Sequence, residues 1–186
     1  IEWKGIFHTG AGSIPDFGSA TFTDSTQIDN SFLLFVVGSL SHYQGGGEDE
    51  AETVAATVLD TTRVILGVDC VIVQVQEYDG ELLTEDTFDW FAQDDAGNVW
   101  YMGEDSPSYE YDEDGNLIGS DTEGSWEAGA DVDGIGENAQ AGYVMTASPN
   151  PLAHSYNQEF YRGIAEDMAV VVVDGARAAA IGDADQ

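Results

Sequence analysis

Hydrophobic and polar residues alternate along the middle of the chain with a period of two, which is typical of a half-buried β-strand. The alternation is clearest over 70–78 and 84–93, and the Asp79-Gly80 pair between them is a strong hairpin signal. The second segment presents an apolar face with Phe88, Trp90 and Ala92, and a polar face with Glu85, Thr87 and Asp89. The pattern therefore predicts an antiparallel hairpin with one solvated face.

Turn signals recur about every 8–12 residues beyond this hairpin, a spacing typical of an antiparallel meander. They predict further strands at 99–102, 109–111, 117–118, 125–127, 143–146, 156–160 and 168–173. Six consecutive apolar residues at 32–37 predict a buried strand that ends at Gly38. Residues 53–66 also fit a helix, but their threonine and valine content favours a strand. The sequence thus predicts a mainly β fold, an antiparallel meander forming an open or partial barrel or a curled sheet.

The chain divides into three predicted parts. Residues 1–29 form a polar N-terminal arm with scattered aromatic residues, in which 2–8 could act as an intermolecular strand; residues 30–174 form the β domain; and residues 175–186 form an alanine-rich acidic tail. The N-terminus lacks the pattern of a signal peptide. Because a transmembrane helix needs about 20 apolar residues, the run at 32–37 is too short, and we expect no transmembrane segment.

The strongly negative net charge argues against several classes of function. Lys and Arg total 4 and Asp and Glu total 36, so the net charge is −32 at pH 7. Phosphate backbones and anionic membrane surfaces would repel such a chain, which argues against nucleic-acid binding. Disorder is also disfavoured, because 42% of the residues are hydrophobic. With Lys4 as the single lysine, the composition indicates an extracellular, halophilic or marine setting, where salt or calcium offsets the repulsion.

Three segments carry recognisable motifs: FDWFAQD at 88–94, GNVWYMGED at 97–105 and TEGSWEAG at 122–129. They resemble a family of exported bacterial β-domains, often lipoproteins, that carries DWYAQDxxGNVWYFGED and STEGSWEAG. The resemblance covers about residues 24–173 and implies β-architecture and export, but no established activity. Family members usually continue with further strands where this chain has its tail. We therefore expect an open sheet edge, and open edges pair with other chains.

Two acidic turns are candidate calcium sites. Asp112, Asp114, Asn116 and Glu123 stand at positions 1, 3, 5 and 12 of an EF-hand-like spacing, and Asp94, Asp95 and Asn98 form a similar cluster. Position 6 of the first is Leu117, where an EF-hand requires glycine, so an EF-hand is rejected. The alternatives are a calcium site of another kind and a solvated hairpin turn. The lone Cys70 is expected to be a buried apolar residue of a strand.

Other candidate chemistry is less specific. A sugar-stacking platform could be built from Trp90, Trp100, Tyr101 and Trp126, although core packing is the commoner role of such residues. The sequence contains no nucleophile elbow, Cys-His pair or phosphate loop, and a chance pair of carboxylates means little among 36 acids. Three hypotheses follow, in order of preference. They are a non-catalytic extracellular assembly protein that associates through sheet edges, a secreted module binding a small ligand, a glycan or calcium, and a carboxylate-based hydrolase.

Overall fold

The structure is a computed structural model that describes residues 13–45, 52–149 and 155–170. Its elements are η1 (Phe17–Ser19), β1 (Leu40–Gly45), β2 (Glu52–Ile65), β3 (Val68–Asp79), β4 (Leu82–Gln93), β5 (Val99–Asp105), β6 (Ser108–Tyr111), β7 (Leu117–Asp121), β8 (Trp126–Glu127), β9 (Gln140–Met145), β10 (Tyr156–Asn157), β11 (Glu159–Phe160) and β12 (Met168–Ala169). None of the described segments forms a helix long and apolar enough to cross a membrane. The predicted intermolecular strand at 2–8 and the tail at 175–186 lie outside the described residues.

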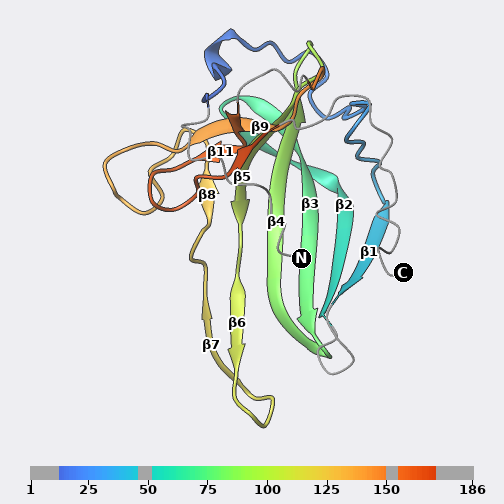
Figure 1. The fold of residues 1–186 in the computed structure, drawn as a ribbon, viewed down its shortest axis with the longest axis vertical. Helices are drawn as coiled ribbons and strands as arrows, with labels where there is room; N and C mark the ends of the chain where they lie inside the picture. Colours follow the sequence, from blue (N-terminus) through green and yellow to red (C-terminus); the bar gives the residue numbers. More distant parts are fainter. Residues whose placement is uncertain (1–12, 46–51, 150–154, 171–186) are drawn as a thin grey trace, which may run out of the picture.

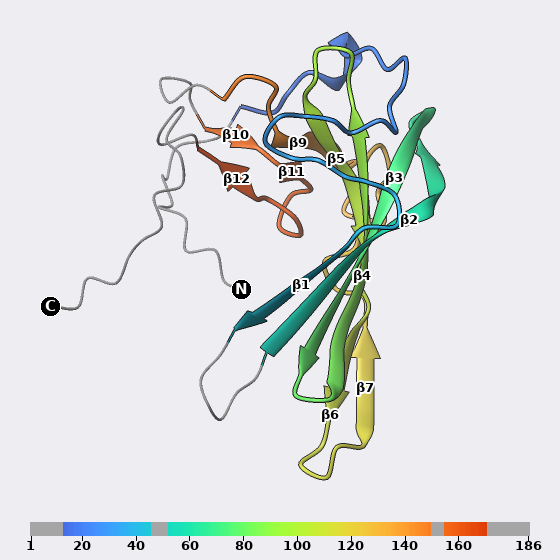
Figure 2. The same cartoon turned by 90° about the vertical axis from the view of Figure 1, so that its right-hand side faces the viewer.

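One antiparallel sheet dominates the fold. Its strands follow the order β1-β2-β3-β4-β5-β9-β11, with the β6–β7 hairpin attached to β4 and β8 attached to β5 (Figure 1). The sheet curls into a half-barrel, and β10 and β12 form a small second sheet beside its upper part (Figure 2). The predicted mainly β fold, a meander in a curled sheet, is therefore confirmed.

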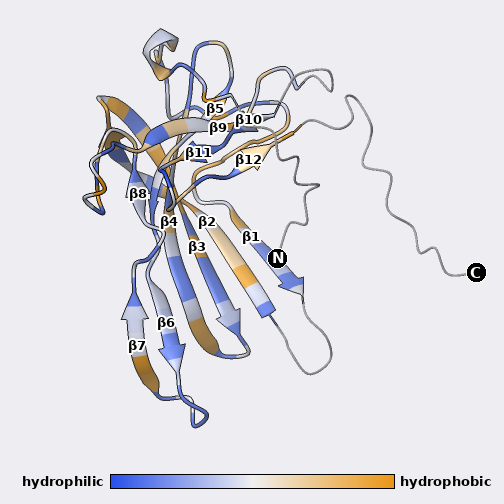
Figure 3. Cartoon of the chain, turned by 60° about the vertical axis from the view of Figure 1, so that its left-hand side comes forward, coloured by the Kyte–Doolittle hydropathy of each residue, from blue (hydrophilic) through white to orange (hydrophobic). Residues whose placement is uncertain are grey.

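The three longest strands form where the sequence predicts strands. β2, β3 and β4 pair in register along most of their length, and a Gly80–Glu81 turn joins β3 to β4. The turn between β2 and β3 also has two residues, with Leu66 at φ 51° and Gly67 at φ 82°. These values suit a type I′ hairpin turn, in which both central residues need positive φ. The lower parts of β3 and β6 carry hydrophilic residues (Figure 3).

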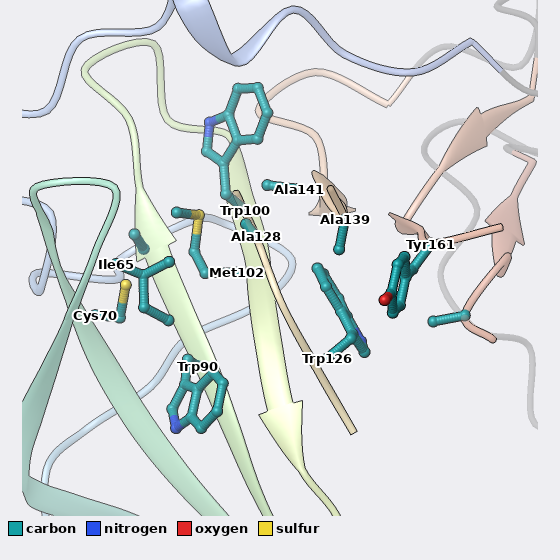
Figure 4. Close-up of a cluster of buried hydrophobic side chains, with 12 residues drawn as sticks. Ile65, Cys70, Trp90, Trp100, Met102, Trp126, Ala128, Ala139, Ala141 and Tyr161 are labelled. Carbon is teal, nitrogen blue, oxygen red and sulfur yellow. The ribbon is translucent and has the colours of Figure 1, made fainter. Parts of the chain in front are cut away.

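The core lies at the upper end of the sheet. One cluster of buried side chains, drawn in Figure 4, contains Trp90, Trp100, Met102, Trp126 and the fully buried Cys70. A second cluster gathers Ile28, Val58, Val71, Val73, Phe91 and Val99. The expectation that Cys70 is a buried apolar residue is confirmed. Part of the predicted arm also belongs to this core, because Phe17 packs edge-on against Trp100 at 5.2 Å.

The prediction of a buried strand at 32–37 is wrong. The segment begins in a bend and ends in a turn and forms no strand, and only Leu34 makes an isolated bridge, to Asp29. Leu33 and Phe35 pack onto the core, whereas Phe32, Leu34 and Val36 are 57%, 63% and 54% exposed. An extended chain turns alternate side chains to opposite sides, and here only one side meets the sheet. A continuous apolar run therefore does not imply that both sides are covered.

Candidate functional site

The turn at Asp112 is held together by its own hydrogen bonds. Asp112 Oδ1 accepts from the backbone N–H groups of Asp114 at 3.0 Å and Asn116 at 2.8 Å, and Asn116 Nδ2 donates to both carboxylate oxygens at 3.1 Å. These bonds hold the pKa of Asp112 below its usual range. Glu123 lies in the turn after β7, where its N–H donates to Asp121. The carboxylate of Asp112 thus acts as the cap of a hairpin turn.

The turn at Asp94 repeats the same Asp-x-x-Gly-Asn motif. Asp94 Oδ1 accepts from the Asn98 backbone N–H at 2.8 Å, and Asp94 Oδ2 accepts from Asn98 Nδ2 and the buried Trp100 Nε1, both at 2.9 Å. Asp95 points elsewhere and accepts from the N–H and hydroxyl of Thr23. Among the described residues, no group of three or more His, Cys, Asp or Glu is placed to hold a metal ion. Calcium binding at these turns stays a prediction.

The four aromatic candidates differ in exposure. Trp90, Trp100 and Trp126 are 4%, 0% and 1% exposed, so these rings belong to the core rather than to an open platform. Tyr101 is half-buried and connects the two parts of the core. Its ring stacks on Phe91 at 5.0 Å and meets Trp126 edge-on at 5.3 Å. The structure therefore places Tyr101 apart from the other three, at the boundary of the apolar core.

The hydroxyl of Tyr101 lies in a cluster of acidic residues that the sequence analysis did not predict. Asp89 on β4 stands directly opposite Glu104 on β5, on the face of the sheet that also carries Phe91 and Tyr101; we call this the inner face. Tyr101 Oη lies 2.6 Å from Asp89 Oδ1 and 2.9 Å from Glu104 Oε2. Burial raises the pKa of Asp89 to about 6, and burial and the charge of Asp89 raise the pKa of Glu104 to about 8.

The two carboxyl groups beside Tyr101 differ in protonation state. A tyrosine hydroxyl has one hydrogen, so Tyr101 donates to only one of its two carboxyl neighbours. The other carboxyl must carry a proton and donate to Tyr101 Oη. Because the pKa of Glu104 is higher and Asp89 makes the shorter bond, Asp89 accepts as a carboxylate and Glu104 donates as a neutral acid near pH 7. The site therefore holds one charge and one shared proton.

A third carboxyl group lies near enough to this pair for its charge to raise the pKa of Glu104. Glu159 on β11 is 8% exposed, and burial together with the charge of Asp167 raises its pKa to about 7. Its Oε2 atom has no hydrogen-bond partner within the described residues, nor does the Nε1 atom of Trp126. The Trp126 N–H lies close enough to lower the pKa of Glu159 without meeting hydrogen-bond geometry. We call Asp89, Glu104 and Glu159, with Tyr101 and Trp126, the inner-face cluster.

The row of acids continues along the inner face. Glu77 stands directly opposite Glu85, and burial and the charge of Glu85 raise the pKa of Glu77. A cavity of about 370 Å³ opens there, lined in part by Tyr43, Val54, Glu77 and Thr84. Like charges placed directly opposite on neighbouring strands destabilise a sheet. The inner face therefore carries two pairs of opposed acids, and in the Asp89–Glu104 pair a retained proton removes one of the two charges.

The described arginines lie away from this row. Arg63 stacks over Trp90 at 4.0 Å and pairs with Glu127, while Arg162 pairs with Glu137 at 3.2 Å. The alternation at 84–93 did place Asp89 and Glu85 together, but it predicted a solvated face. The sequence signal that could have identified the site is the spacing of acids on one face of adjacent strands.

A second feature lies at the β1 edge of the sheet. β1 pairs with β2 on one side, and no described strand pairs with its other side. The exposed side chains of Phe32, Leu34, Val36, Val37 and Leu40 lead into it, each more than half exposed. About one residue in five of the chain is charged, yet 30–47 contains no Asp, Glu, Lys or Arg. We call residues 32–45 the neutral edge.

Comparison of the chain with protein-family models, with curated proteins and with solved structures gave no significant match. The resemblance to exported bacterial β-domains therefore remains a prediction carried by the three motifs.

Proposed function

We propose that this protein is a non-catalytic structural component outside the cell, and that copies associate through the neutral edge. The observation that carries the proposal is the row of exposed apolar side chains that runs into a strand with an unpaired side. Natural edge strands are usually protected by charged residues, proline or a covering segment. β1 contains neither a charged residue nor proline. Such an edge is a template for adding another strand.

Charge favours a second copy as the partner that binds there. Two molecules that each carry a net charge of −32 repel over most of their surfaces. The neutral edge is a stretch along which they can approach without facing carboxylates. In about 1 M salt the Debye length falls to roughly 3 Å, so the remaining repulsion is screened. Association is therefore expected to strengthen with salt, as suits a protein of saline or calcium-bearing surroundings.

The test compares two matched substitutions by sedimentation velocity across a salt series. Val36→Glu adds a charge to the neutral edge, and Val64→Glu adds the same charge at a similarly exposed valine on β2. We expect the wild-type protein and Val64→Glu to associate increasingly as NaCl rises, and Val36→Glu to remain monomeric. A wild-type protein that is monomeric at every salt and protein concentration would refute the proposal. Equal association of the two variants would place the interface elsewhere.

One further variant separates the possible strands. Deletion of residues 1–12 leaves the described core complete and removes the segment in which the sequence predicts an intermolecular strand. If edges pair with edges, the deletion leaves association unchanged. If association is lost, the strand that each copy contributes lies in 1–12.

The alternative of a secreted module for a small ligand is favoured by one observation, the inner-face cluster.

A further inference from the structure

The lower part of the main sheet has two open edges. Its strands follow the order β1-β2-β3-β4-β6-β7, because β6 takes the place beside β4 that β5 takes higher up. β1 and β7 lie at opposite sides of this part of the sheet (Figure 1, Figure 2). Among the described strands, none pairs with the outer side of β7, just as none pairs with the outer side of β1. The sheet is therefore open to extension from either side.

The two open edges run in opposite directions. Each of the five pairings that lead from β1 to β7 is antiparallel. Five reversals of direction leave β7 antiparallel to β1. A second copy placed beside the first, without being turned over, would therefore lay its β7 antiparallel to β1 of the first copy. Such a pair continues the antiparallel hydrogen-bonding pattern of the sheet from one copy into the next.

The open edge of β7 carries exposed apolar side chains. Leu117 and Ile118 are 58% and 65% exposed. The stretch 117–120 contains no charged residue and no proline, which are the residues that usually protect an edge. The β6–β7 hairpin also projects beyond the end of the β3–β4 hairpin (Figure 1). This edge therefore reaches a neighbouring molecule before the rest of the acidic surface does.

Charge selects β1 as the strand that pairs with β7. An antiparallel pair of two β7 strands would place Asp121 of each copy near the acidic turn at 112–114 of the other. Like charges opposite each other on neighbouring strands are destabilising. β1 contains no Asp, Glu, Lys or Arg, so β7 meets no like charge on it. A pair of two β1 strands would also avoid like charges, but it would leave Leu117 and Ile118 in water.

We propose that β7 of one copy pairs with β1 of the next, so that copies join head to tail into an open-ended filament. The inference rests on the proposed association through the neutral edge, and it names the strand that this edge receives. A contact between two different surfaces leaves one of each free after every addition, whereas a contact between two β1 strands would stop at a dimer. The twist of the sheet rotates each added copy relative to the last, which favours a helical filament over a flat ring.

Sedimentation velocity in high salt tests the pairing with three substitutions that each add one carboxylate. Ile118→Glu blocks β7, Val36→Glu blocks the neutral edge, and Val64→Glu is the control on β2, at a valine that is 63% exposed. A carboxylate buried without a partner in a new contact is costly, so each of the two blocks should weaken association about tenfold or more. The wild-type protein and Val64→Glu should form species larger than a dimer, whose mass grows with protein concentration.

Mixing the two blocked variants tests which edges meet. Val36→Glu keeps an intact β7, and Ile118→Glu keeps an intact β1. At a concentration where each variant alone is monomeric, their equimolar mixture should form dimers and nothing larger. Leu117→Glu is a second block of β7, and it should give the same result in place of Ile118→Glu. Urea unfolding of each variant shows that a missing dimer does not reflect a missing fold.

The outcomes separate this inference from the association on which it rests. If both β7 variants associate like the wild-type protein while Val36→Glu is monomeric, pairing with β7 is overturned and association through the neutral edge stands. A wild-type protein that stops at a dimer, or a mixture of folded blocked variants that stays monomeric, would also overturn the pairing. A wild-type protein that is monomeric at every salt and protein concentration would overturn both proposals.

Discussion

Replacing Glu104 by glutamine should stabilise the protein in alkaline solution and leave it unchanged in acid. Glutamine has the shape of the neutral acid that the structure places beside Tyr101, and its amide can donate to Tyr101 Oη in the same way. Burial and the charge of Asp89 raise the pKa of Glu104 in the folded protein from an ordinary 4.5 to about 8. The folded state therefore binds this proton more tightly than the unfolded chain.

The sign follows from proton linkage. Where the folded state holds more protons than the unfolded state, the free energy of unfolding falls as pH rises. For Glu104 the cost is absent below about pH 4.5, grows between 4.5 and 8, and is complete above 8. At 1.36 kcal/mol for each pKa unit, the full displacement corresponds to about 5 kcal/mol. Partial contact with solvent and the proton shared with Asp89 reduce this, so we expect about 2 kcal/mol.

The assay is urea unfolding of both proteins at pH 4.5, 7 and 9 in high salt, with Asp105→Asn as the control for removal of one negative charge. Glu104→Gln should gain about 2 kcal/mol over that control at pH 9 and nothing at pH 4.5. A gain of the same size at both pH values would show that charge repulsion over the whole molecule, not the burial of Glu104, is responsible. A loss of stability at pH 9 would refute the assignment of a neutral Glu104.

Two further predictions concern local geometry, and unfolding measurements check both. Gly103→Ala should lower the free energy of unfolding by about 3 kcal/mol or more, because Gly103 has φ +134° and an added Cβ would lie 2.4 Å from the Trp126 carbonyl oxygen. Gly124→Ala is the matched control: with φ +95° and open space around the added Cβ, it should cost about 1 kcal/mol. Equal costs would remove the steric argument. Asp94→Ala should lower the free energy of unfolding by about 2–3 kcal/mol, because it leaves the buried indole N–H of Trp100 unpaired. Asp112 caps the equivalent turn but is exposed, so Asp112→Ala should cost about 1 kcal/mol. A larger loss at Asp112 would show that its turn does more than cap a hairpin.

Local pattern accounts for most of the strands. β3 and β4 lie within two residues of the predicted segments at 70–78 and 84–93, because alternation and a glycine turn act over neighbouring residues. The two Asp-x-x-Gly-Asn turns were also predicted as turns, and the hydrogen bonds that close them are local. The prediction of a buried strand at 32–37 was wrong because hydrophobicity alone does not show that only one side of the segment meets the sheet.

The sequence by itself determined the class of the fold, the positions of its hairpins and the large negative charge. Only the tertiary structure decided which face of each alternating strand is enclosed. The polar face of β4 was expected to lie in water, but Asp89 is largely withdrawn from water beside Tyr101 and Glu104 of β5. The partners of Asp89, Tyr101 and Glu104, come from the neighbouring strand β5. Burial of its charge therefore depends on how neighbouring strands pack and pair, which the period of a single strand does not encode.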